Sequence, residues 1–296
     1  MSNRWWEITV VCDPALEEAV FWRLDLFGCS GTATHPGQTH RVVAYISDLR
    51  TTEADLASLR ESLETDARDR EEAINSVSWQ KIEEEDWAKS WKQYWQPQPI
   101  GDRFIINPAW LEAPTDTERL VMRLDPGAAF GTGTHATTQL CLESLEMRLS
   151  QGAENIAIAD VGCGSGILTI GALLLGAKSA IGVDNDPLAV KTCRANCLLN
   201  NINQDAITIE EGSINDLVSM GQVYDGVLCN ILADIIVGLF PHFNDITHEN
   251  SWAILSGILV EQADRIADVV ENNGWTIATI WKREPWCCFN IRRSEY

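Results

Sequence analysis

Three glycines at alternate positions carry the clearest chemical signal in the chain: Gly162, Gly164 and Gly166, preceded by Asp160. They follow one short apolar run and open another, so they stand where a buried strand turns into a helix. Glycine is needed there when a ligand lies directly against the backbone, because a Cβ atom would collide with it. The G-x-G-x-G spacing differs from the G-x-G-x-x-G of dinucleotide sites and favours a nucleoside ligand without phosphates.

A carboxylate follows the next apolar strand at a spacing that suits a ribose. Asp184 ends the run Gly182-Val183-Asp184 and lies 22 positions after Gly162. At that spacing a carboxylate at the end of a strand can accept hydrogen bonds from both ribose hydroxyls. Three glycines alone could be only a tight turn, but together with the strands, the helix and Asp184 they predict an adenosine-type pocket.

A second segment, rich in glycine and threonine, runs from Asp125 to Thr138 and leads into a predicted helix. Its glycines permit close approach of a ligand, and Phe130 could lie against a flat or cationic group. A threonine hydroxyl at the helix start could cap the helix or donate to a ligand. His135 is either a general base or a structural hydrogen-bonding residue, and the whole segment could be a plain surface loop. Four of its residues are candidates for cofactor contact: Phe130, Thr132, Gly133 and Thr138.

Asn230 stands at the end of a predicted strand, in the run Asn230-Ile-Leu-Ala233. Open α/β sheets bind their ligands at this edge, and an asparagine offers both an acceptor and donors. If the nucleophile is an amine, the Asn230 carbonyl can hold its N–H groups and aim its lone pair at an electrophilic carbon. Asn230 is therefore a candidate for both catalysis and cofactor contact; the alternative is a residue that merely forms the loop.

These motifs resemble those of the bacterial methyltransferases of ribosomal protein L-eleven (L11), a family of class I S-adenosylmethionine-dependent methyltransferases, over essentially the whole chain. The segments that carry the resemblance are Phe130-Gly-Thr-Gly-Thr-His135, Asp160–Leu168, Gly182–Pro187, Asn230–Ala233 and Leu255–Leu259. The glycine motif alone indicates the superfamily, whereas the loop ending at His135 points to this family. Three positions depart from the family pattern: Ala136, Asn185 and Asp234.

The resemblance implies a cofactor, a substrate and a reaction. Thr138, Gly162, Asp184 and Asn230 would contact S-adenosylmethionine, and the acceptors would be lysine side chains and the N-terminal amine of L11. An N-terminal domain would recognise that ribosomal protein. The expected reaction is in-line transfer of a methyl group to a neutral amine, without a metal or a covalent enzyme intermediate, and positioning would supply most of the catalysis.

The elements that must position these residues alternate between strand and helix from about residue 120 onward. The predicted strands are 156–160, 179–183, 207–210, 226–230, 253–256, 275–281 and 287–292, and the predicted helices are 167–175, 187–199, 233–243 and 260–272. No helix fits between the last two strands, so they should pair antiparallel. The sequence therefore predicts an α/β fold in which a Rossmann-like, seven-stranded methyltransferase domain follows a smaller N-terminal α+β (ferredoxin-like) domain.

The first part of the chain gives a different pattern. Predicted strands at 5–12, 41–47 and 76–82 enclose two amphipathic helices, and a turn rich in glycine, proline and threonine precedes the second strand. Trp87, Trp91 and Trp95 then form a stripe that either packs on a neighbouring domain or presents aromatics to a partner. The predicted domains are a substrate-recognition domain at 1–84, a Trp-rich linker and lead-in at 85–120, and a methyltransferase domain at 121–296.

The composition of the chain indicates which kinds of binding partner to expect. The chain has 296 residues and a net charge of −21, which argues against a grip on a phosphate backbone and favours a basic protein substrate, or merely keeps the protein soluble. Its nine cysteines form no Cys-x-x-Cys pair, so reduced thiols and no metal are expected. No apolar run is long enough to span a membrane. We expect a cytoplasmic monomer that binds L11 and contacts neither nucleic acid nor membrane.

Two other readings stay open at this point. A methyltransferase of this fold could act on a small molecule or on nucleic acid, although an additional domain is superfluous for the first and the acidic charge disfavours the second. The chain could also be a binding module that senses the cofactor without catalysis. Binding of S-adenosylhomocysteine with no transfer to any ribosomal protein would favour that last alternative.

Overall fold

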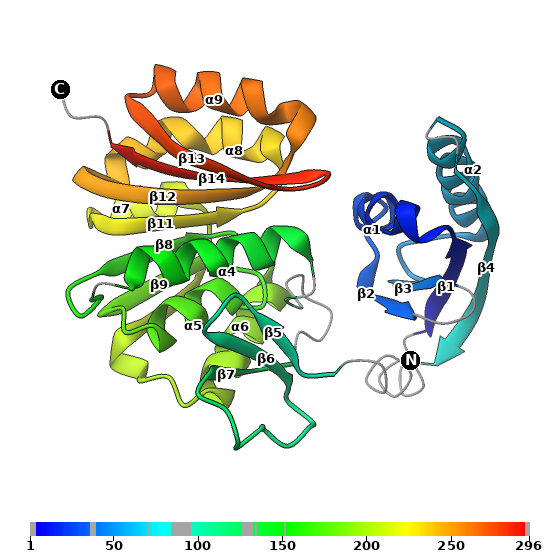
Figure 1. Cartoon of the computed structure of the whole chain (residues 1–296), viewed down its shortest axis with the longest axis horizontal. Helices are drawn as coiled ribbons and strands as arrows, with labels where there is room; N and C mark the ends of the chain where they lie inside the picture. Colours follow the sequence, from blue (N-terminus) through cyan, green and yellow to red (C-terminus); the bar gives the residue numbers. More distant parts are fainter. Residues whose placement is uncertain are drawn as a thin grey trace. The chain divides into compact units, whose positions relative to one another are not determined.

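The computed structural model describes residues 4–35, 40–69, 72–83, 96–125, 133, 135–150 and 152–293. The chain divides into two compact units, Met1–Gln96 and Pro97–Tyr296, both drawn in Figure 1. Each unit has its own sheet and its own core. Within the described residues, no helix is both long and apolar enough to cross a membrane.

The first unit is an antiparallel sheet with two helices on one face. Its strands are ordered β2-β3-β1-β4 (Figure 1). Apolar side chains of β1 and β3 meet those of α1 and α2 in one core. The elements are β1 (Arg4–Cys12), α1 (Glu17–Leu26), β2 (Ser30–His35), β3 (Arg41–Ser47), α2 (Glu53–Asp69) and β4 (Ile74–Glu83). This order of elements and strands is ferredoxin-like, as predicted.

One expectation for the first unit is wrong. The segment assigned to a turn after the first helix contains the strand β2, which pairs with β3 along the edge of the sheet. Its sequence, SGTATH, has no alternation of apolar and polar residues. The strand forms because β3 supplies hydrogen-bonding partners. Pairing of this kind cannot be predicted from the hydrophobicity of the segment itself.

The second unit contains a seven-stranded sheet in the order β10-β9-β8-β11-β12-β14-β13. All its neighbours run parallel except at β14, which is antiparallel to both β12 and β13. The strands are β8 (Ala157–Val161), β9 (Ser179–Asp184), β10 (Ile207–Glu211), β11 (Tyr224–Asn230), β12 (Thr247–Leu259), β13 (Trp275–Arg283) and β14 (Trp286–Arg293). All seven predicted strands and the antiparallel final pair are confirmed, and with them the α/β fold class.

Helices cover both faces of this sheet, as Figure 1 shows. On one face lie α4 (Ala136–Leu149), α5 (Ile167–Leu174) and α6 (Pro187–Leu199). On the other lie α7 (Ile214–Met220), α8 (Ala233–Leu239) and α9 (Ala263–Asn272), which join the sheet in a core that includes Phe240, Phe243 and Trp275. The sequence analysis did not anticipate the short helix α7.

A small third sheet precedes the glycine-rich segment and was also not anticipated. It consists of β5 (Gln98–Ile100), β6 (Phe104–Pro108) and β7 (Leu120–Leu124), and β6 and β7 run parallel. These strands belong to the second unit, which begins at Pro97. The tryptophan stripe at residues 87, 91 and 95 lies outside the described residues, and the functional division into three domains stays a prediction.

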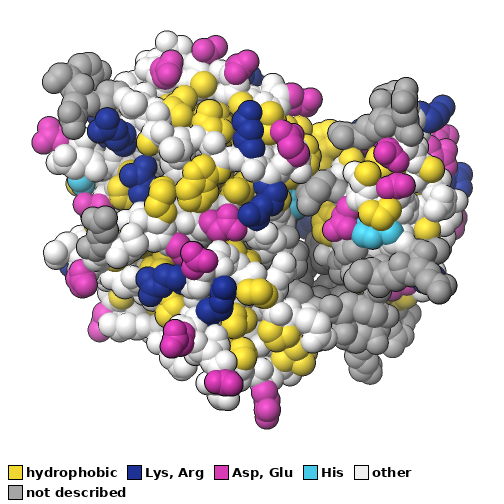
Figure 2. Space-filling model, viewed as in Figure 1, with side chains coloured by type: hydrophobic (Ala, Val, Ile, Leu, Met, Phe, Trp, Pro, Cys, Tyr) yellow, Lys and Arg dark blue, Asp and Glu magenta, His cyan; other side chains and the backbone are white. Residues whose placement is uncertain are grey.

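Charged side chains of both signs lie on the surface, and the cysteines lie inside the protein. Figure 2 shows acidic and basic side chains interspersed over the visible face of the second unit, so the excess of acid forms no single patch there. All nine cysteines are buried with free thiols. Burial fits a role of these side chains as small apolar core residues, and their reduced state stays a prediction.

Candidate active site

The glycine motif forms a tight turn at the carboxyl end of β8. All three glycines have positive φ, +76° at Gly162, +54° at Gly164 and +83° at Gly166, a region that residues with a Cβ rarely adopt. The amide of Gly162 donates to the carbonyl of Val183 on β9 at 2.9 Å. This bond ties the turn to the end of β9, where Gly162 and Gly164 stay partly exposed.

Asp184 lies at the carboxyl end of β9, beside this turn. Its Oδ2 accepts a hydrogen bond from the Gly164 amide at 2.9 Å, and its Oδ1 accepts one from the Asp186 amide at 3.0 Å. A carboxylate held by two backbone amides has a fixed direction and keeps lone pairs for further donors. The structure thus brings together the predicted carboxylate and the predicted glycine turn.

Asn230 lies at the carboxyl end of β11, next to β8 in the sheet. Its Nδ2 donates to Oγ1 of the buried Thr138 on α4 at 3.4 Å, so two predicted site residues from distant segments meet. Its Oδ1 is buried and has no hydrogen-bond partner in the described part of the protein. A buried acceptor without a donor is costly in a folded protein, and this one lies at the carboxyl edge of the sheet, where open α/β sheets bind their ligands.

Two glycines pack closely against Ile231, the residue that follows Asn230. A Cβ on Gly162 would lie 2.5 Å from Cγ2 of Ile231, and a Cβ on Gly257 would lie 2.2 Å from the Ile231 carbonyl oxygen. Neither approach is possible with a side chain present. The residue after Asn230 is therefore packed on both sides, its side chain against Gly162 and its backbone against Gly257.

Asp160 is a buried carboxylate at the base of the glycine turn. It accepts hydrogen bonds from the amide of Thr169 at 3.0 Å and from its hydroxyl at 2.5 Å. Burial raises the pKa of Asp160 to about 7, the Thr169 donors act in the opposite direction, and the charge of Asp184 raises it further. The carboxyl is therefore only partly ionised near neutral pH, and a cationic ligand group nearby would favour its ionised form.

His135 caps the first turn of α4. Its Nδ1 accepts the amide of Thr137 at 3.4 Å, and its ring lies edge-on to Trp286 with 4.9 Å between the centroids. Burial lowers the pKa of His135 to about 4, so the imidazole is neutral at pH 7. Of the two roles considered for this residue, the observed contacts favour the structural one.

The glycine- and threonine-rich segment is described only in part. Gly133 has φ +86°, and a Cβ there would lie 3.0 Å from Ile167 on α5 and 3.1 Å from Ile106 on β6. Close packing thus ties this segment to the helix that begins at the glycine turn. Phe130 and Thr132, two further cofactor candidates, lie outside the described residues.

Two asparagines that the sequence analysis missed join these parts. Asn196 on α6 is fully buried; its Oδ1 accepts the Asp125 amide and its Nδ2 donates to the Ser165 carbonyl, both at 2.9 Å. One turn later, Asn200 accepts the Arg123 amide at 2.8 Å and donates to the Arg123 carbonyl at 2.7 Å. Asn196 therefore bridges the start of the glycine- and threonine-rich segment and the glycine turn. The sequence feature that could have indicated them is their spacing, because two asparagines four residues apart lie on the same face of a helix.

Of the three departures from the family pattern, Asp234 has a partner on the surface. Its carboxylate pairs with Arg265 of α9, and both side chains are more than half exposed. Exposed pairs of this kind contribute little to stability. Asp234 thus points to a neighbouring helix and leaves the buried Asn230 acceptor unaltered.

Comparison with known proteins agrees with this geometry. The family model described as ribosomal protein L11 methyltransferase (PrmA) matches residues 4–294. A ribosomal protein L11 methyltransferase from Thermosynechococcus vestitus is 47% identical over 99% of this chain and 98% of its own length. The same enzyme from a Cyanothece species is 47% identical over 99% of this chain and 100% of its own.

A solved structure of an L11 methylase is also similar to this chain. The ribosomal protein L11 methylase of Lactobacillus delbrueckii subsp. bulgaricus has a TM-score of 0.62 and 31% identity, over 68% of this chain and 100% of that chain. Together, a family match over nearly the whole length and relatives close to half identical leave one assignment. The chain belongs to the ribosomal protein L11 methyltransferase family.

Proposed function

We propose that this chain transfers methyl groups from S-adenosylmethionine to lysine side chains and to the N-terminal amine of ribosomal protein L11. The observation that carries the proposal is the buried, unpartnered Oδ1 of Asn230 at the carboxyl end of β11. An N–H donor is what that oxygen lacks, and an amine substrate supplies one.

The residues around Asn230 fit the cofactor. The turn at Gly162, Gly164 and Gly166 has positive φ at all three glycines, and Asp184 beside it offers a fixed carboxylate to two ribose hydroxyls. Thr138 and the segment with Phe130, Thr132 and Gly133 would complete the pocket. When bound, S-adenosylmethionine supplies an electrophilic methyl group on a sulfonium centre.

The substrate amine must be neutral to act as a nucleophile. This is easier for an N-terminal amine, whose pKa is about 7.7 to 8.0, than for a lysine at about 10.4. Asn230 Oδ1 would accept one N–H of the amine, and the exclusion of water would lower the amine pKa because the charged form loses its hydration. Asn230 thus orients the lone pair, and fixed positioning supplies most of the rate increase.

The substrate assignment rests on the names of the relatives and on charge. Both curated relatives are named for action on L11, and the net charge of −21 would attract a basic protein. In this proposal residues 1–84 recognise L11 and residues 121–296 carry out the transfer. A cytoplasmic location and a monomeric state stay predictions.

Intact-mass spectrometry of purified L11 tests the proposed function. We expect a ladder of methyl additions after incubation with the enzyme and S-adenosylmethionine, and no ladder with the Asp184→Ala variant. An unchanged L11 mass, while calorimetry still shows cofactor binding by the wild-type enzyme, would refute the substrate and leave the cofactor site in place.

The Asn196 bridge gives a further prediction. Asn196→Leu leaves the Asp125 amide and the Ser165 carbonyl without this partner, so the glycine turn should lose order and the Kd for S-adenosylhomocysteine should rise about tenfold. Asn200→Leu is the matched control, because its lost side-chain bonds go to Arg123 and to its own helix. Each variant should lower the free energy of unfolding by about 1 to 3 kcal/mol. Equal changes in Kd for both variants would contradict the bridging role.

A further inference from the structure

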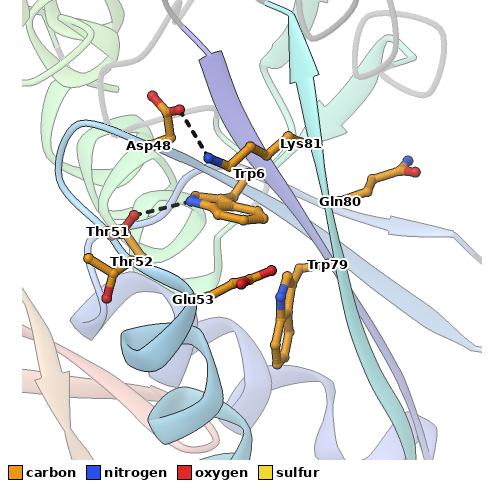
Figure 3. A pocket seen from close by; sticks show the side chains of 8 residues that line it. All are labelled: Trp6, Asp48, Thr51, Thr52, Glu53, Trp79, Gln80 and Lys81. Carbon is orange, nitrogen blue, oxygen red and sulfur yellow. Dashed lines mark hydrogen bonds and ion pairs between the residues drawn. The ribbon is translucent and has the colours of Figure 1, made fainter.

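The first unit contains a pocket of about 580 Å³ at the start of α2, beside β1 and β4 (Figure 3). Two indoles and two carboxylates dominate its lining: Trp6, Trp79, Asp48 and Glu53. The remaining lining residues are Thr51, Thr52, Gln80 and Lys81. Aromatic faces next to carboxylates are the surroundings that bind ammonium and guanidinium groups in proteins.

One cation of the chain already lies in part of this pocket. The Nζ of Lys81 is 4.6 Å from the centroid of the Trp6 ring and 3.5 Å from an oxygen of Asp48. The latter distance exceeds the roughly 2.7 to 2.9 Å of a direct charge-assisted hydrogen bond, and the Lys81 side chain is 45% exposed. Trp6 itself is fixed, because its Nε1 donates to the Thr51 carbonyl at 3.1 Å. The Trp6 side of the pocket thus accommodates an alkyl ammonium that is only loosely held.

The other side of the pocket has a carboxylate without a cation. Figure 3 shows the Glu53 side chain pointing toward the two indoles. Within the described part of the chain, the Glu53 carboxylate makes no hydrogen bond or ion pair, whereas Asp48 pairs with Lys81. Trp79 is partly buried against the core, with the Arg60 guanidinium 5.5 Å from its ring centroid.

We propose that this pocket binds a lysine or arginine side chain of the protein substrate, between the Glu53 carboxylate and the Trp79 indole. The occupant follows from charge complementarity: a carboxylate that has no partner among the described residues, beside an indole and on a chain of net charge −21, selects a cation. The pocket anchors a basic residue of the substrate on the first unit, separate from the amine that reacts. This inference rests on the proposed function, which supplies the basic protein.

The proposal also predicts an effect of Lys81, opposite in direction to that of Glu53. Its ammonium repels an incoming cation and occupies Asp48, which would otherwise attract one. Removal of the Lys81 charge should therefore strengthen substrate binding, while removal of the Glu53 charge should weaken it. Neither residue is part of the core, because both lie at exposed positions, so neither substitution should disturb the core.

The test compares two substitutions with two controls on the same unit. Glu53→Gln should raise the KM and the Kd for L11 about three- to tenfold, and Lys81→Gln should lower both about threefold. Glu61→Gln and Arg68→Gln make the same charge changes at exposed positions of α2 outside the pocket, and should move both constants by less than about twofold. The KM for S-adenosylmethionine and kcat should stay unchanged in all four variants.

Calorimetry measures binding of L11 to the full-length chain, and mass spectrometry measures its methylation. The two measurements test the pocket proposal and the proposed function separately. If L11 is methylated but Glu53→Gln behaves like Glu61→Gln, the pocket proposal is wrong and the function stands. If L11 binds more weakly to Glu53→Gln but is never methylated, the pocket stands and the function is wrong. If wild-type enzyme neither binds nor methylates L11, both are overturned.

Discussion

Replacement of Asn230 by alanine is expected to lower kcat for L11 methylation about a hundredfold, while the Kd for S-adenosylhomocysteine changes by less than about threefold. The Asn230 Oδ1 is buried and has no hydrogen-bond partner among the described residues, and Thr138 orients the side-chain amide. An amine that loses this acceptor also loses its direction, and misplacement by about 1 Å can cost about 10²-fold in rate. Single-turnover kinetics with saturating cofactor would measure the effect.

A second asparagine provides a closely matched control. Asn290 on β14 is buried, donates through Nδ2 to the Ser144 hydroxyl of α4 at 3.0 Å, and has an unpartnered Oδ1. It thus shares its bonding state with Asn230 but lies on another strand. Asn290→Ala should lower stability with little change in kcat. Equal losses of turnover in the two variants, or equal losses of turnover and cofactor affinity in Asn230→Ala, would refute the orienting role.

Substitution of Asp184 by alanine should weaken cofactor binding about a hundredfold or more. Two hydrogen bonds from ribose hydroxyls to a carboxylate contribute about 1.5 kcal/mol each at the low end, and each 1.4 kcal/mol is tenfold in Kd. The variant also loses the acceptor for the Gly164 amide, which helps to hold the glycine turn. Titration calorimetry with S-adenosylhomocysteine would measure the change, and Asp184→Asn, which keeps one acceptor oxygen, should fall between alanine and wild type.

Asp186→Asn is the control for charge at this position. Asp186 lies two residues further on, and its carboxylate caps α6 by accepting the Leu188 amide at 2.8 Å. Asparagine caps helices as well as aspartate does, so this variant removes one negative charge and keeps the local structure. Its Kd should stay within about threefold of wild type. A similarly small change in Asp184→Ala would show that the ribose contact is elsewhere.

The seven-stranded sheet could be predicted because its central strands, such as β8, β9 and β11, are buried on both faces. Runs such as Ala157–Val161 and Ser179–Asp184 are short and apolar, and glycines mark their ends. The strands that escaped prediction are β2 and the three strands of the small sheet, β5, β6 and β7. All four are short, and β2, β5 and β7 are paired along one edge only. Their existence depends on a neighbouring strand, and a local sequence pattern does not contain that information.

The candidate site was predictable where backbone conformation demands a residue type. The positive φ angles at Gly162 and Gly166 could be inferred from the spacing, and so could a carboxylate at the end of β9. The bridge made by Asn196 could not, because its partners lie 71 residues before it and 31 residues before it in the chain. Contacts of that kind arise only once the sheet has brought β7, the glycine turn and α6 together.

The strand order of the second unit bears on how the protein is made. β14 lies between β12 and β13, although it follows both in the chain. During translation one edge of β12 therefore stays unpaired until residues 286–293 have left the ribosome, and open strand edges invite pairing with other chains. The first unit has a similar interval, because one edge of β1 stays unpaired until residues 74–83 have emerged. We expect the nascent chain to expose an open strand edge to chaperones between the emergence of β12 and that of β14.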